Sequence, residues 1–97
     1  MATAPTAPRT DIDPEAILRH VPPWVVILHN DDHNGMDHVV ESLLDCVPPL
    51  TQEGAVEVML TAHEHGMATV IACPQETAEL YRDRLESRGL TATIEAA

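Results

Sequence analysis

The chain has 97 residues, which is too few for more than one domain with a short extension. It contains 16 acidic residues, five arginines and no lysine, and its formal net charge is −11. Nucleic acids and anionic membranes would be repelled by such a surface, so we expect neither as a partner. The charge favours basic or amine-bearing partners instead.

The two cysteines, Cys46 and Cys73, lie in apolar segments and lack C-x-x-C spacing. This pattern indicates free thiols in a reducing compartment. The N-terminus lacks the basic and then apolar pattern of a signal peptide, and no apolar run is long enough to span a bilayer. We therefore expect a cytoplasmic protein.

Residues 1–21 are predicted to form a flexible N-terminal extension, and residues 22–97 the folded domain. The first eight residues, MATAPTAP, are small residues and prolines that bury too little apolar surface to become ordered. An Asp-Pro-Glu start signal predicts one or two helical turns within residues 11–19. Pro22 and Pro23 then interrupt any helix and mark the domain boundary.

The first predicted strand is Trp24 to His29, written WVVILH. Both of its alternating faces are largely apolar, which predicts a central strand and not an edge strand. Asn30, Asp31 and Asp32 follow directly. Adjacent carboxylates at the end of a buried strand cost stability unless a cationic group uses them.

Two helices are predicted next. Apolar residues recur at three- and four-residue intervals from Met36 to Val47, which is typical of one helix face. Asn34 is predicted to be the N-cap of this helix. Thr51 is predicted to cap the second helix, which runs to about His65 before Gly66 ends it.

The remaining elements are a second strand from Met67 to Cys73, a third helix opened by Pro74 and ended by Gly89, and a third strand from Leu90 to Glu95. This order, β-α-α-β-α-β, predicts a small α+β two-layer sandwich, a three-stranded sheet with three helices on one face. The pattern leaves the direction of each strand pair open.

Catalysis and metal binding have little support in the sequence. Asp31, Asp32 and His63 could form an acid–base pair, but so many carboxylates make that easy, and no nucleophile or phosphate-loop motif is present. His63 and His65 lie on different sides of a helix, and neither zinc-type spacing nor a cysteine ligand set accompanies them. We therefore expect no enzymatic activity, no metal and no cofactor.

An amine-binding site fits the residue types better. A protonated α-amino group has three donors, and Asn30, Asp31 and His63 offer amide, carboxylate and imidazole acceptors. Apolar side chains that could surround the group next to the amine are Met36, Val39, Met59 and Ala62. From the pattern alone, however, a simpler interpretation is favoured, with turn carboxylates and core methionines.

Two segments carry a resemblance to a known family. Residues 25–36 followed by Val39, and MLTAHEHGMA from Met59 to Ala68, resemble the ClpS family. The matching motifs are Asn-Asp-Asp after an apolar strand, a methionine four residues after Asp32, and a helix ending in Met-Leu-x-x-His-x-x-Gly. The resemblance covers about residues 22–97. It implies a monomeric bacterial adaptor that delivers N-degron substrates to a Clp AAA+ unfoldase.

The resemblance also implies roles for individual residues. The substrate α-amino group would be bound by Asn30, Asp31, Asp32 and His63. The pocket for a first side chain that is Leu, Phe, Tyr or Trp would be lined by Asn34, Met36, Val39, Met59, Ala62 and Leu90. His63, again, and Glu76 would dock on the N-domain of a ClpA- or ClpC-like unfoldase.

Ala62 departs from the family pattern, which usually has a larger β-branched residue there. This departure leaves an alternative open. The domain would then dock on a Clp ATPase and modulate it without binding N-degrons.

Overall fold

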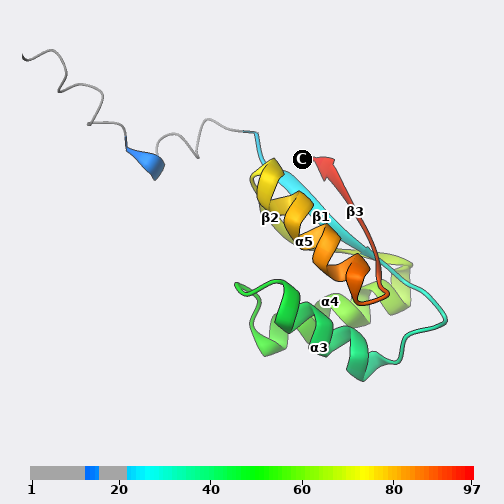
Figure 1. The fold of residues 1–97 in the computed structure, drawn as a ribbon. Coiled ribbons are helices and arrows are strands. Elements are labelled where there is room, and N and C mark those ends of the chain that lie inside the picture. Colours follow the sequence, from blue (N-terminus) through cyan, green and yellow to red (C-terminus); the bar gives the residue numbers. More distant parts are fainter. Residues whose placement is uncertain (1–12, 16–21) are drawn as a thin grey trace, which may run out of the picture.

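The computed structural model describes residues 13–15 and 22–97. Its elements, in chain order, are β1 (Trp24–His29), α3 (Met36–Cys46), α4 (Gln52–His65), β2 (Met67–Cys73), α5 (Gln75–Ser87) and β3 (Thr91–Ala96). The predicted element order and the α+β sandwich are confirmed (Figure 1). The predicted flexible extension lies, apart from residues 13–15, outside the described residues, and the boundary at residue 22 stays a prediction.

The three strands form one sheet in the order β2-β1-β3, and both pairs are antiparallel. β1 is therefore central, as its two apolar faces predicted. The β1–β2 pairing shifts register between Val26 and Ile27, whereas β1 pairs regularly with β3. At the end of β3, the Ala97 amide donates to the Pro23 carbonyl at 3.0 Å, so the C-terminus lies beside the start of the domain.

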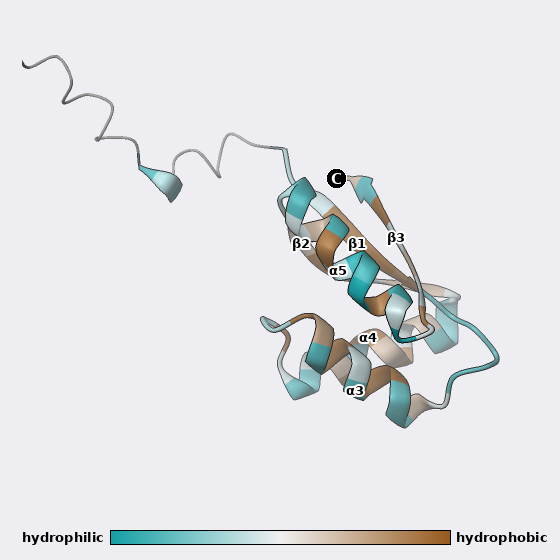
Figure 2. Ribbon diagram, viewed as in Figure 1, coloured by the Kyte–Doolittle hydropathy of each residue, from teal (hydrophilic) through white to brown (hydrophobic). Residues whose placement is uncertain are grey.

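The core lies between the sheet and the helices. Val26 and Leu28 on β1 are buried in it. α4 packs on β2 and β1, α5 packs on β3 and β1, and α3 packs on α4 and α5 (Figure 1). Much of β1 is hydrophobic along its length (Figure 2). Burial of each large aliphatic side chain contributes about 1.5–3 kcal/mol, and α3 adds Leu43, which is fully buried.

Three predicted helix boundaries are confirmed. The Thr51 hydroxyl accepts a hydrogen bond from the Gly54 amide at 3.0 Å, which caps α4. Gly66 and Gly89 have φ angles of 93° and 84°, and only glycine adopts this left-handed conformation without strain. The two glycines therefore reverse the chain after α4 and α5.

Four boundaries differ from the prediction by one residue, one of them the end of β3, which is Ala96 and not Glu95. α3 ends at Cys46 and not at Val47. α5 begins at Gln75 because Pro74, with ψ of 154°, is extended and acts as its N-cap. β3 begins at Thr91 because the Leu90 amide donates to the Leu85 carbonyl at 3.1 Å and closes the end of α5.

Both cysteines are free thiols, as predicted, with Cys46 buried and Cys73 half-buried. Burial raises the pKa of each thiol, which keeps it protonated and unreactive. Among residues 13–15 and 22–97, no helix is both long and apolar enough to cross a membrane.

Candidate functional site

The polar loop after β1 is fastened to the end of α4. The backbone amide of Asn30 donates to the Gly66 carbonyl at 2.9 Å. Gly66 ends α4, and the last turn of that helix carries His63. Both Asn30 and His63 are exposed. The strand end and the helix end, more than thirty positions apart in the sequence, thus present polar side chains in the same region.

Asp31 is the hydrogen-bonding centre of this loop. Its Oδ1 accepts from the amides of His33 and Asn34, both at 2.8 Å. The Asn34 side-chain nitrogen donates to Oδ1 at 3.1 Å and to Oδ2 at 3.0 Å. Desolvation raises the pKa of Asp31, but the bonds from Asn34 and His33 outweigh it and hold the pKa below 3.8. The carboxylate is therefore ionised at neutral pH.

The prediction that Asn34 caps α3 is wrong. The N-cap is Gly35, which has an extended backbone and, having no side chain, makes no capping hydrogen bond. The Asn34 side chain turns back toward Asp31, and its nitrogen also donates to the Gly89 carbonyl at 2.9 Å. The bonds that its nitrogen donates to a carboxylate in the same loop and to a distant carbonyl therefore hold the side chain in an orientation in which its oxygen does not cap α3.

α3 and α4 provide the apolar part of the region. Met36 begins α3 and remains 47% exposed, while Val39, one turn later, is half-buried. On α4, Met59 is half-buried and Ala62 is only 2% exposed. Since α3 packs against α4, these side chains lie between the two helices.

A cavity of about 300 Å³ lies where the loop, α3, α4 and the residue just before β3 meet. It is lined by Leu28, His29, Asn30, Asp31, Asp32, Asn34, Gly35, Met36, Val39, Met59, Ala62, His63 and Leu90. All ten residues predicted for the amine and side-chain sites are in this lining, although their roles in binding stay predictions. Sequence reasoning missed Leu28, His29 and Gly35. The sequence signal that could have identified these three residues is their position next to the polar cluster.

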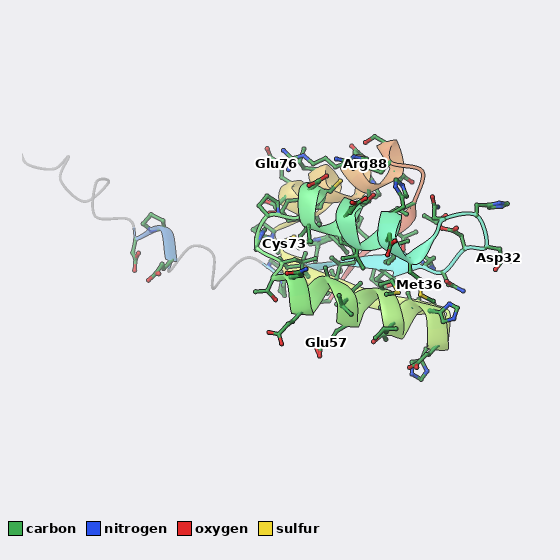
Figure 3. All side chains as sticks on the ribbon, turned by 90° about the horizontal axis from the view of Figure 1, so that it is seen from below. Asp32, Met36, Glu57, Cys73, Glu76 and Arg88 are labelled. Carbon is green, nitrogen blue, oxygen red and sulfur yellow. The ribbon has the colours of Figure 1, made fainter. Side chains whose placement is uncertain are left out.

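Glu76 is the predicted site residue that the structure does not bring to the cavity. It is exposed in the first turn of α5, and Figure 3 places it at the opposite end of the domain from Asp32 and Met36. His63 precedes β2 by a few residues and Glu76 follows it by a few. The two predicted docking residues are thus separated by the length of a seven-residue strand, about 20 Å.

The charge around the cavity is negative. Asp31 and Asp32 both line it, and Asp32 is exposed at the tip of the loop (Figure 3). In the part of the chain that the structure describes, the two ion pairs are Arg82–Asp83 and Arg88–Asp45, so neither loop carboxylate is paired. No group of three or more His, Cys, Asp or Glu side chains within that part could hold a metal ion. The arrangement can therefore accept a cation by hydrogen bonds beside an apolar cavity.

Comparison with known proteins agrees with these features. Residues 19–93 match the family model "ATP-dependent Clp protease adaptor protein ClpS". The ClpS adapter protein of Synechococcus sp. strain CC9902 is 44% identical over 85 residues, covering 88% of this chain and 82% of that protein. The ClpS adapter protein of Synechococcus elongatus is 49% identical over 74 residues, covering 76% and 78%.

A solved structure has the same fold. It is Agrobacterium tumefaciens ClpS2 bound to L-phenylalaninamide, with a TM-score of 0.73 and 27% sequence identity. The match covers 78% of this chain and 98% of that one. The chain therefore belongs to the ClpS family of ATP-dependent Clp protease adaptor proteins.

Proposed function

We propose that this Clp protease adaptor binds the N-terminal residue of N-degron substrates and delivers them to a Clp AAA+ unfoldase. The preferred first residues are Leu, Phe, Tyr and Trp. The observation that carries the proposal is a cavity of about 300 Å³ that combines hydrogen-bond acceptors on one side with apolar side chains on the other. An N-terminal residue with a large apolar side chain has the matching chemistry, an ammonium group next to a hydrophobic group.

The acceptors suit a protonated α-amino group. Asn30, Asp31, Asp32 and His63 are the proposed binding set, and all four line the cavity. The carboxylate of Asp31 is ionised, and among residues 13–15 and 22–97 its Oδ2 accepts from Asn34 alone, which leaves acceptor capacity on that atom. A charge-assisted hydrogen bond contributes about 1.5–3 kcal/mol, so two or three of them distinguish a free N-terminus from an internal peptide nitrogen.

The apolar side suits a large side chain. Met36, Val39, Met59, Ala62 and Leu90 are the proposed pocket residues, with Asn34 at the boundary to the loop. Methionine adjusts its shape to different partners, and burial of a large side chain contributes on the order of 2 kcal/mol. The similar structure of ClpS2 holds L-phenylalaninamide, a molecule with an α-amino group and an aromatic side chain. This likeness supports the same ligand class here.

Delivery requires contact with the unfoldase. We propose that His63 and Glu76 contact the N-domain of a ClpA- or ClpC-like partner. Because His63 lines the cavity and Glu76 lies beyond the far end of β2, such a contact would extend from the edge of the cavity along the domain to the start of α5. A substrate bound in the cavity and an unfoldase near α5 could then be held at the same time.

The test is a titration of fluorescent peptides followed by anisotropy. Peptides that begin with Phe or Leu should bind with micromolar or better affinity. The same peptides with an acetylated N-terminus, and a matched peptide that begins with Gly, should show no measurable binding. Equal binding of free and acetylated peptides would contradict the proposal. No binding to any of them, with altered activity of a Clp ATPase, would support the alternative that the domain only modulates that enzyme.

A further inference from the structure

The side-chain amide of Asn34 lies between two parts of the cavity wall. Its nitrogen donates to both carboxylate oxygens of Asp31, at 3.1 and 3.0 Å, and to the Gly89 carbonyl at 2.9 Å. An amide nitrogen has two hydrogens. One is shared by the two oxygens of Asp31 and the other is directed to Gly89, so both are used.

Gly89 is joined directly to the apolar wall of the cavity. The next residue, Leu90, is 4% exposed and lines the cavity. A second side chain holds the same turn, because His38 Nε2 lies 2.8 Å from the Arg88 carbonyl oxygen and must donate to it. The turn between α5 and β3 is therefore held at two consecutive carbonyl groups, by Asn34 just before α3 and by His38 in its first turn.

We infer that Asn34 is a positioning residue that fixes the Asp31 carboxylate relative to Leu90, and so sets the spacing between the amine-binding side and the side-chain pocket. The inference rests on the proposed function. It assigns Asn34 a role different from contact with the substrate side chain, since both of its donors are already used inside the protein.

The donor count limits which residues could take this role. Aspartate has the same shape but no hydrogen to donate, and it would place a second carboxylate beside Asp31. Serine has one donor on a shorter side chain, which could reach Asp31 but not Gly89 as well. Asparagine provides two donors in a fixed plane, which the two acceptors require.

The first experiment measures peptide affinity at pH 7.5 for wild-type protein, Asn34→Asp and Asn34→Ser, with His33→Ala as the control. His33 lies in the same loop, does not line the cavity, and donates its hydrogen bond to Asp31 from a backbone amide that the substitution retains. We expect affinity for a Phe-initiated peptide to fall at least about tenfold in Asn34→Asp and less in Asn34→Ser. The control should bind like the wild type.

The second experiment needs no peptide. The pKa of Asp31 is followed by NMR of its carboxyl carbon, and the Leu90 methyl signals are recorded in the same samples. In Asn34→Asp we expect the pKa of Asp31 to rise and the Leu90 methyl signals to shift, because both contacts of the amide are lost. Because Asn34→Asp also adds a negative charge beside Asp31, the uncharged Asn34→Ser is measured in parallel, and a residue that merely filled space in the turn would leave the pKa of Asp31 unchanged in that variant. If Asn34→Asp does not fold, the same two measurements on Asn34→Ser replace it.

The outcomes are separable. Wild-type affinity in the Asn34 variants, with an unchanged pKa of Asp31, would overturn the inference and leave the proposed function standing. Failure of the wild-type protein to bind peptides with a free N-terminus would overturn the proposed function, and the inference with it. Loss of affinity together with a raised pKa of Asp31 and shifted Leu90 signals would support both.

Discussion

The polar and apolar sides of the cavity are built in different ways. The polar side consists mostly of one loop, residues 30–34, whose central carboxylate is bonded to its own neighbours. Among the proposed amine-binding residues, only His63 comes from another element, the end of α4. The apolar side takes residues from α3, from α4 and from the turn just before β3, which meet only when the domain is folded.

This difference predicts two kinds of response to substitution. Hydrogen bonds depend strongly on distance and angle, so a change on the polar side should remove binding or leave it intact. Apolar contacts are non-directional, and methionine adapts, so a change on the apolar side should alter the order of preferred ligands. The exposed fractions on the apolar side range from 47% for Met36 to 2% for Ala62. Substitutions at its different positions should therefore have effects of different size.

The largest effect is expected for Asp31→Ala. The variant removes an ionised acceptor for the substrate amine and the centre of the loop hydrogen bonds, so affinity for a Phe-initiated peptide should fall about 100-fold. Calorimetric titration measures the change. Asp37→Ala is the control, because it removes an exposed carboxylate from the first turn of α3 that is outside the cavity lining. Equal affinities for the two variants would show that Asp31 is not an amine acceptor.

The parts of the fold that could be predicted from the sequence are those with local signals. β1 and β2 were predicted with their exact bounds because alternation, β-branched residues and flanking Pro or Gly are local signals. Thr51, Gly66 and Gly89 were recognised as helix ends for the same reason. The central position of β1 followed from its two apolar faces. Antiparallel pairing did not, because strand direction depends on how the connecting helices return.

The candidate site was predicted less completely. Asp31 and its neighbours stood out as a costly polar cluster, but the prediction that Asn34 caps α3 was wrong. Its partner, the Gly89 carbonyl, is 55 residues away, and no local pattern points to it. Leu90 was assigned to the pocket only through the resemblance to the ClpS family. Residues that reach a site through tertiary packing, such as Leu28, leave no separate signal in the sequence.

A smaller, graded effect is expected for Ala62→Val. Two added methyl groups at a position only 2% exposed would reduce the space at the base of the cavity. Affinity for a Trp-initiated peptide should fall about tenfold relative to a Leu-initiated peptide, which corresponds to about 1.4 kcal/mol. Anisotropy titrations of Leu, Phe, Tyr and Trp peptides give the order. Thr61→Val is the control, because it places the same side chain one position away, outside the cavity lining. Parallel losses for all four peptides would contradict a graded apolar side.

The smallest effect concerns the stability of the polar loop without any ligand. The pKa of Asp31 is lowered in the folded state from its ordinary value of 3.8, so its ionised form stabilises the fold. That stabilisation is fully present above about pH 4 and is lost as the pH falls through the lower folded-state pKa.

Asp31→Asn keeps the shape of the side chain but has no charge to lose. In urea unfolding, the variant should be about 1 kcal/mol less stable than the wild type at pH 7. This difference should shrink as the pH is lowered toward 3. If the difference stays constant over that range, the loop is held by the shape of the side chain, and the contrast between a directional polar side and an adaptable apolar side would lose its electrostatic basis.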